Sequence, residues 1–211
     1  MDERRGDDTL LSAWRDGEAE AARALIERYS DDLLRFFRGK VGVDAEDLIQ
    51  QTLLGCLEAI ERRASMATFR AYLFGIARNR LIDHFRRQGR NDDEFDPTQR
   101  SLADLAASPS AVVAARNDQR LLADALRRIP LDLQILLELH YWEQMSSAEV
   151  SGVLGIPAGT VRGRIGRARE LLRDQMERAG ASPEVLRRTA ESLETWARSV
   201  QRRTAEHEDP R

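Results

Sequence analysis

Apolar residues recur every three or four positions between residues 67 and 90, the spacing that places them on one face of an α-helix. This face is formed by Leu73, Phe74, Ala77, Leu81, Ile82 and Phe85. The opposite strip is formed by Asn79, Asp83, Arg86 and Arg90. The pattern predicts a helix with one side packed in a core and the other free to contact a partner.

Two amphipathic helices are expected near the start of the chain. Thr9 can cap a short helix that Gly17 ends. The second helix carries apolar positions at helical spacing from Ala21 to Phe37. Gly39 and Gly42 should then break the chain, because glycine is a poor helix former.

A third helix is expected from residue 45 onward, with Asp44 placed to cap it. Its inward positions are Leu48, Thr52 or Leu53, Cys56 and Ile60. Its outward positions are Asp47, Gln50, Gln51 and Glu58. Because Cys56 lies on the apolar side, we interpret it as a small core residue.

The composition changes after the helix that spans residues 67–90. Residues 91–110 are polar and acidic and contain two prolines, which predicts a flexible linker. Ser108 and Pro109 signal the start of a helix that runs to Arg128, and Pro130 lies at the first turn of the next helix. A second domain is therefore expected after the linker.

Residues 146–176 have the pattern of a helix-turn-helix. Ser146 and Glu149 form a capping box for a short helix, Gly155 suits a left-handed turn, and Pro157 opens a longer helix. The packing face of that longer helix is formed by Val161, Ile165, Ala168 and Leu172. Its opposite face and flanks carry Arg162, Gly163, Arg164, Gly166, Arg167 and Arg169. This layout is typical of a recognition helix, although a helical hairpin without a DNA role has the same pattern.

Composition and charge narrow the choice of fold and partner. Leucine, alanine, arginine and glutamate dominate and glycine and proline are few, which favours an all-α protein. The formal net charge is -3, yet eight arginines and only two acids lie between Ile60 and Arg90. Positive charge concentrated in one part of an acidic protein indicates a polyanionic partner, and nucleic acid is the first candidate. The alternative is that the arginines form a solvated face without a partner.

Several classes of function are disfavoured. Cys56 is the only cysteine, and His84, His140 and His207 do not have metal-ligand spacing, so no disulfide, metal, cofactor or catalytic residue is expected. No apolar run is long enough to span a membrane, and the acidic, polar start is unlike a signal peptide. We therefore expect a cytoplasmic protein that does not bind a membrane.

Three stretches together resemble the extracytoplasmic-function group of bacterial sigma-70 factors. The family's polymerase-docking helix is similar to AEDLIQQTLLGCLEAI at residues 45–60. The helix that melts and reads the minus-ten element is similar to FRAYLFGIARNRLIDHFRR at residues 69–87. The minus-thirty-five domain is similar to residues 126–173.

The resemblance implies a region 2-like helical domain at 8–90, a linker at 91–110, a region 4-like domain at 111–178 and a helical extension at 179–211. It implies a sigma factor that binds core RNA polymerase and promoter DNA, with an anti-sigma protein as a further candidate partner. Polymerase contacts fall on Asp47, Leu48, Gln50 and Gln51. Minus-ten contacts fall on Arg78, Asn79, Arg80, Arg86 and Arg87. Minus-thirty-five contacts fall on Thr160, Arg162, Gly163, Arg164, Gly166, Arg167 and Arg169.

Some assignments stay open at the level of sequence. The loop from Arg62 to Thr68 corresponds to the segment that holds a flipped minus-ten base in relatives, but no aromatic precedes Phe69 to identify the capturing residue. The extension begins a helix at Pro183, which either packs on its own domain or serves as a partner or autoinhibitory helix. The rival functions are a stand-alone helix-turn-helix regulator and a nucleic-acid enzyme that uses His84 or His140.

Overall fold

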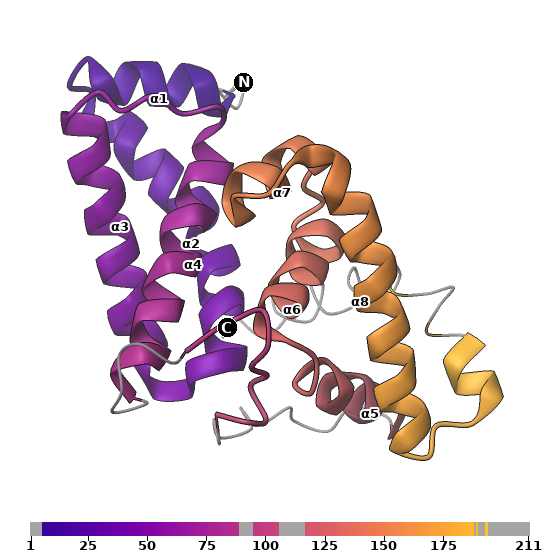
Figure 1. Cartoon of the computed structure of the whole chain (residues 1–211). Coiled ribbons are helices and arrows are strands. Elements are labelled where there is room, and N and C mark those ends of the chain that lie inside the picture. Colours follow the sequence, from indigo (N-terminus) through magenta and orange to yellow (C-terminus); the bar gives the residue numbers. More distant parts are fainter. Residues whose placement is uncertain (1–5, 89–94, 106–116, 188, 190–192, 194–211) are drawn as a thin grey trace, which may run out of the picture. The chain divides into compact units, whose positions relative to one another are not determined.

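The part of the chain that the structure describes is built from helices joined by turns and loops, as the composition predicts. The computed structural model describes residues 6–88, 95–105, 117–187, 189 and 193, with the backbone alone at 117–119. Within these ranges the only β-pairing is an isolated bridge between Ser101 and Pro130. The chain forms two compact units, the first mainly of residues up to Phe95 and the second mainly of residues from Asp96 onward (Figure 1).

The first unit is a bundle of four helices. They are α1 (Asp7–Arg15), α2 (Ala19–Val41), α3 (Ala45–Glu61) and α4 (Phe69–Gln88), with a 3-10 turn at Gly42–Asp44 before α3. Helix α1 packs on α2, and α3 packs on both α2 and α4. The apolar face predicted for α4 is confirmed, because all six of its residues are at most 5% exposed.

Aromatic contacts join these helices at the centre of the bundle. The rings of Phe36 and Phe74 meet edge to face with centroids 5.6 Å apart, and those of Tyr29 and Phe69 are 5.7 Å apart. The hydroxyl of Tyr29 donates a hydrogen bond to Asp7, which also pairs with Arg28. Burial and the hydrogen bond to Asp7 raise the pKa of Tyr29, so its phenol remains a donor that ties α1 to α2.

Two of the expected helix ends in this unit were wrong. Helix α1 begins at Asp7 with Gly6 at its N-cap, so Thr9 lies inside the helix. Helix α2 continues through Gly39 to Val41 and ends at Gly42, whose φ is +61°. A helical glycine costs about 1 kcal/mol. The turn that contains Gly39 is held by Lys40, whose ammonium lies over the Phe36 ring and donates to the Phe36 carbonyl.

The second unit is built on α5 (Asn117–Leu126), α6 (Leu131–Leu137) and α8 (Ala158–Arg178). A π-helical turn, Glu138–Trp142, extends α6, and α7 (Ser147–Leu154) precedes α8. Helix α8 packs against α5 and α6. The core of this unit includes the fully or nearly fully buried side chains of Leu102, Leu122, Ile129, Leu131, Ile135, Leu136, Val161 and Ala168.

Part of the segment predicted as a flexible linker is packed in this unit. The Leu102 side chain is fully buried, and the Leu131 N–H donates to the Arg100 carbonyl at 2.9 Å. The acidic residues act here as turn formers: Asp96 accepts the Thr98 N–H at 2.8 Å, and Asp104 accepts the Ser101 N–H at 2.9 Å. Composition alone could not show whether these acidic residues stabilise turns or are simply solvated. The expected helix start at Ser108 and Pro109 lies outside the described residues.

The turn between α7 and α8 follows the predicted pattern. The Ser146 N–H donates to Glu149 Oε2 at 2.9 Å and the Glu149 N–H donates to Ser146 Oγ at 3.3 Å, which confirms the capping box. Gly155 has a φ of +65°, a left-handed conformation that favours glycine. Pro157 occupies the N-cap of α8 and Pro130 the N-cap of α6, one position before the first turn expected for each. None of the helices in the described ranges has the length and apolarity needed to cross a bilayer.

Candidate nucleic-acid interface

Helix α8 carries its buried and exposed residues on opposite sides. Val161, Ala168, Leu172 and Met176 are each at most 2% exposed and anchor the helix to its unit. The exposed residues from the predicted minus-thirty-five set are Thr160, Arg162, Gly163, Gly166, Arg167 and Arg169. Arg164 is half-buried. The four residues that periodicity placed opposite the packing face, Arg162, Gly163, Gly166 and Arg167, are thus all exposed, and of the two flanking arginines Arg169 is exposed and Arg164 is half-buried.

The open face of α8 carries an exposed ion pair and two glycines. Arg167 lies 3.5 Å from Glu170 across a largely exposed pair, which contributes little to stability. A Cβ atom placed on Gly163 or Gly166 would meet no atom within 4 Å. Packing within the chain therefore does not require glycine at either position, and the two residues leave room for a close approach to this part of the helix.

Helix α4 presents a second basic face, which is more heavily tied into its unit. Asn79, Arg86 and Arg87 are exposed, as the sequence predicts. Arg86 lies 3.6 Å from Asp83, one turn earlier on the same helix. Arg78 is half-buried, in agreement with its place within the apolar arc. Arg90 lies outside the described residues.

Arg80 is placed differently from the other arginines of this set. Its Nη2 would lie 3.6 Å from a Cβ on Gly55, so its guanidinium lies beside α3. Its Nε is buried and has no hydrogen-bond partner in the part of the chain that the structure describes. Gly55 also lets Ile76 of α4 come close, because an added Cβ would be 3.2 Å from Ile76 Cγ2. Arg80 therefore packs at the α3–α4 contact, which the arginine pattern did not predict.

The expected polymerase-docking residues do not all reach the surface of α3. Asp47 and Gln50 are exposed and Gln51 is half-buried. Leu48 is only 4% exposed, so the resemblance placed it on a surface that its side chain does not form. The apolar spacing of α3 had predicted that Leu48 points inward. Its side chain therefore belongs to the core rather than to the exposed face.

Two exposed leucines extend the same side of α3. Leu54 is 59% exposed and Leu57 is 39% exposed, and both are among the few large apolar side chains that the described residues leave open. Leu54 follows Asp47 by seven residues, or two helical turns, so it shares that face. The helical spacing could have identified Leu54 and Leu57, but the contacts implied by the resemblance end at Gln51.

The loop between α3 and α4 is braced by α1. Arg62 and Arg63 are exposed, and Arg63 has a left-handed φ of +51°. Arg15 Nη2 donates to the Ala64 carbonyl at 2.8 Å, and the Trp14 and Phe69 rings are 6.2 Å apart. Thr68 closes the loop by accepting the Ala71 N–H at 3.2 Å at the start of α4. Contacts from α1 and the Thr68 cap thus brace this surface loop, and the exposed Arg62 adds a 3.5 Å ion pair with Glu58.

The titratable groups outside these faces have structural explanations. Burial raises the pKa of the Cys56 thiol to about 12, which agrees with its interpretation as a core residue. Burial lowers the pKa of His84, although Asp44 lies 3.7 Å away and acts in the opposite direction. Across the described ranges, no three side chains of histidine, cysteine, aspartate and glutamate gather in a way that would hold a metal ion.

Both basic helices fall within regions that match known families. Residues 25–91 match the family described as Sigma-70 region 2, which includes α3 and α4. Residues 119–172 match Sigma-70, region 4, which includes α7 and most of α8. The arginine-bearing face of α4 thus falls within the region 2 match, and that of α8 falls within the region 4 match.

Curated relatives match the chain over most of its length. The chain is 33% identical over 168 residues to the ECF RNA polymerase sigma factor SigL of Mycobacterium tuberculosis, a match that covers 78% of this chain and 94% of SigL. It is 25% identical over 190 residues to the ECF RNA polymerase sigma-E factor of Haemophilus influenzae, covering 84% of this chain and 98% of that protein.

Solved structures show the same fold. The structure of CnrH in complex with the cytosolic domain of CnrY is similar with a TM-score of 0.59 and 26% identity, covering 81% of this chain and 97% of that chain. The sigma factor RpoE of Bartonella quintana, solved with the anti-sigma factor NepR, has a TM-score of 0.56 and 22% identity, covering 74% of this chain and 96% of that one. The chain therefore belongs to the extracytoplasmic-function group of sigma-70 factors, which bind core RNA polymerase and direct promoter-specific initiation of transcription.

Proposed function

We propose that α8 reads the minus-thirty-five element and α4 contacts the minus-ten element, while α3 docks on core polymerase. The observation that carries this assignment is that each unit presents one exposed arginine-bearing helix face whose opposite side is buried. A rigid helix with a basic outer face suits a DNA groove, because the buried side fixes the direction in which the arginines project.

On α8, Arg162 and Arg167 are proposed to reach base edges, and Thr160, Arg164 and Arg169 to hold phosphates. Arginine recognises guanine through two hydrogen bonds in the major groove, and phosphate contacts fix the register of the helix. Gly163 and Gly166 support this assignment, because their open surroundings allow the DNA backbone to approach closely. Residues 111–178 form the corresponding domain in this proposal.

On α4, Asn79, Arg86 and Arg87 are proposed as the minus-ten contacts within a domain at residues 8–90. Arg78 and Arg80 are proposed to support the helix from its half-buried flanks, since both are only partly exposed. For capture of an unstacked base, the exposed loop residues Arg62, Arg63 and Ser65 are the proposed candidates.

The polymerase-docking surface is proposed to consist of Asp47, Gln50, Gln51, Leu54 and Leu57. The exposed leucines support it, because buried contacts at an interface require apolar side chains that the free protein leaves open. Leu48 is not part of this surface. A polymerase partner would cover Leu54 and Leu57 while the polar residues around them fix its orientation.

Control by an anti-sigma protein is part of the proposal. CnrH was solved with the cytosolic domain of CnrY and RpoE with the anti-sigma factor NepR, so two proteins of this fold are held by such partners. The chain is further proposed to act in the cytoplasm and to carry out no covalent chemistry of its own. Melting would be driven by capture of unstacked bases together with the polymerase.

A reconstituted transcription assay tests the proposal. The full chain is mixed with core RNA polymerase and a genomic promoter library, and both association and run-off transcripts are measured. We expect co-purification with core enzyme and initiation at a defined subset of promoters. A Leu54→Asp variant should lose association while an Asp31→Ala control, at an exposed position on α2, retains it. Equal association of the two variants would show that the docking surface lies elsewhere.

A further inference from the structure

The guanidinium of Arg80 lies at the edge of the contact between α3 and α4. A Cβ placed on Gly55 would be 3.6 Å from Arg80 Nη2 and 3.2 Å from Ile76 Cγ2, so both of these α4 side chains lie beside this glycine of α3. Arg80 follows Ile76 by four residues, so the two share one ridge of α4. Both side chains are half-buried. The charged group of Arg80 therefore reaches the surface of α3.

Arg80 has no counter-charge among the residues that the structure describes. Its Nε is buried without a partner, and its guanidinium takes part in no ion pair or hydrogen bond within the described ranges. Asp83, one turn further along α4, lies 3.6 Å from Arg86 instead. Glu58, one turn along α3 from the contact, lies 3.5 Å from Arg62. A partly desolvated cation without a partner is unfavourable, so this position would gain from a carboxylate supplied by another molecule.

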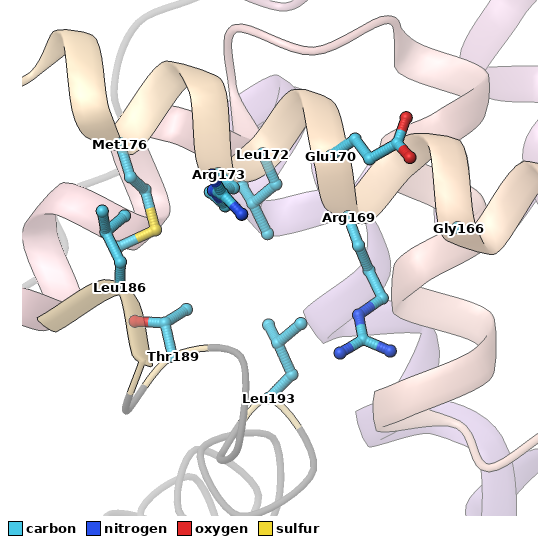
Figure 2. A pocket seen from close by; sticks show the side chains of 9 residues that line it. All are labelled: Gly166, Arg169, Glu170, Leu172, Arg173, Met176, Leu186, Thr189 and Leu193. Atoms are coloured by element: carbon cyan, nitrogen blue, oxygen red, sulfur yellow. The ribbon is translucent and has the colours of Figure 1, made fainter. Parts of the chain in front are cut away.

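An arginine beside a cavity in the second unit provides a comparison. The cavity measures about 310 Å³ and lies between α8 and the described residues of the extension (Figure 2). The lining residues from the extension are Leu186, Thr189 and Leu193. Figure 2 shows Leu186 opposite Met176, so this part of the extension lies against α8. Arg173 also lines the cavity, and its Nε donates to Glu177 Oε1 at 2.9 Å. Its charge is thus matched within its own helix, unlike that of Arg80.

The charged group of Arg80 adjoins the proposed polymerase-docking surface. Gln51 precedes Gly55 by four residues, so the two lie on one ridge of α3. Leu54, which is 59% exposed, directly precedes Gly55 in the chain. A partner that lies along α3 over Gln51 and Leu54 therefore meets the Arg80 guanidinium at Gly55. Arginine is one of the residues enriched in the buried centres of protein interfaces.

The charge of α3 favours a protein partner over nucleic acid at this position. Its acidic residues are Glu46, Asp47, Glu58 and Glu61, and the helix contains no lysine or arginine. A nucleic-acid backbone laid over α3 would be repelled by these carboxylates. A single carboxylate directed at Arg80 avoids most of this repulsion and still gains a charge-assisted hydrogen bond.

We propose that Arg80 is a polymerase contact whose guanidinium donates to a carboxylate of core RNA polymerase at the α3–α4 edge. The inference rests on the proposed docking surface of α3 and extends that surface onto α4. Because a guanidinium can donate two parallel hydrogen bonds to one carboxylate, this contact fixes the orientation of the partner as well as adding affinity. Base contacts to the minus-ten element remain with the exposed Asn79, Arg86 and Arg87.

Two substitutions at the same position test the role of the charge. Arg80→Gln and Arg80→Lys both remove the planar guanidinium from the α3–α4 contact, but only glutamine removes the charge. The full-length chains are titrated with core RNA polymerase free of sigma factor, and dissociation constants are measured by fluorescence anisotropy at several salt concentrations. Concentrations are corrected for the folded fraction measured by near-ultraviolet circular dichroism, so a loss of stability common to both variants does not enter the result.

We expect the two variants to differ. Arg80→Gln should weaken association by about tenfold, the lower end for a hydrogen bond to a charged group, and should reduce its salt dependence. Arg80→Lys should stay within about threefold of the unmodified chain, because an ammonium still pairs with a carboxylate. An Arg38→Gln control makes the same change of charge at an exposed position on α2 and should alter neither quantity.

Three results would overturn the proposal. Equal weakening by both variants with unchanged salt dependence would assign the effect to packing. Unchanged association in both variants would remove Arg80 from the docking surface. Loss of minus-ten base discrimination in Arg80→Gln with association intact would make Arg80 a DNA contact.

The docking surface and the Arg80 contact fail in different ways. If Leu54→Asp loses association while Arg80→Gln keeps it, the inference about Arg80 fails and the docking surface on α3 stands. If both variants keep association, the docking assignment on α3 fails and the Arg80 contact fails with it.

Discussion

Helices α4 and α8 both carry arginines outward, but they differ in how far each is built into its unit. Eight residues of α4 are buried, including three phenylalanines, whereas four residues of α8 are buried. On α4, Arg78 and Arg80 are half-buried, while on α8 only Arg164 is. We therefore expect substitutions of the half-buried arginines of α4 to affect folding as well as the proposed DNA contact, whereas substitutions of the exposed arginines of α8 should affect the proposed contact alone.

The largest expected effect is the loss of stability on removing a core side chain of α4. Phe74→Ala removes a fully buried ring that meets Phe36 edge to face, and should lower the free energy of unfolding by about 3–5 kcal/mol. Arg167→Ala on α8 should change it by less than about 0.5 kcal/mol, because the side chain is exposed. Urea denaturation of both variants checks the contrast, and similar losses for the two would refute it.

The next effect concerns DNA recognition by α8. Arg162→Ala or Arg167→Ala should weaken binding at a cognate minus-thirty-five element by about 1–3 kcal/mol and relax base preference. The unfolding free energy should stay nearly constant, since both side chains are exposed. The measurement is transcription from a set of promoter variants. A promoter preference identical to that of the unmodified chain would show that α8 is docked wrongly here.

Replacing glycine by alanine on α8 and on α3 should change stability by amounts that differ by about 1 kcal/mol. Gly163→Ala should stabilise α8 by about 1 kcal/mol, because alanine is the better helix former and its Cβ meets no atom within 4 Å. Gly55→Ala should lack this gain, because its Cβ would lie 3.2 Å from Ile76 Cγ2 at the α3–α4 contact. Denaturation midpoints should therefore separate the two variants. Equal stabilisation would mean that α3 and α4 are not closely packed at this point.

The smallest effect is a pH dependence within the first unit. Burial lowers the folded-state pKa of His84 below its ordinary value of 6.5, so the folded state takes up a proton less readily than the unfolded state. The stabilising contribution is complete above 6.5 and is lost as the pH falls through the lower folded pKa. His84→Gln should flatten the decline in stability between neutral and mildly acidic pH. An unaltered decline would assign it to other groups.

Sequence periodicity predicted the elements in which one face is continuously apolar. The arc from Leu73 to Phe85 and the buried side of α8 from Val161 to Leu172 were both visible as helical repeats. The capping box at Ser146 and the left-handed Gly155 were also predicted, because they depend on local hydrogen bonds and backbone sterics. Features of this kind can therefore be predicted from a few neighbouring residues.

Features that depend on contacts between distant segments were not predicted. The burial of Leu102 requires α5 and α6 to be in place, so its polar surroundings suggested a linker. Arg80 lies beside α3 at Gly55, a contact between two helices that no pattern within α4 reveals. Leu48 shows the opposite case, because the apolar spacing predicted its burial while the resemblance placed it among the surface contacts. The remainder of the extension beyond Leu193 lies outside the described residues.

The most direct measurement is run-off transcription with core polymerase on one cognate promoter carrying single-base changes in either element. Arg86→Ala on α4 should alter discrimination only at the minus-ten element, and Arg162→Ala on α8 only at the minus-thirty-five element. This separation is expected because the two exposed faces belong to different units. If both variants changed discrimination at the same element, or neither changed it at all, the assignment of one basic helix to each element would be contradicted.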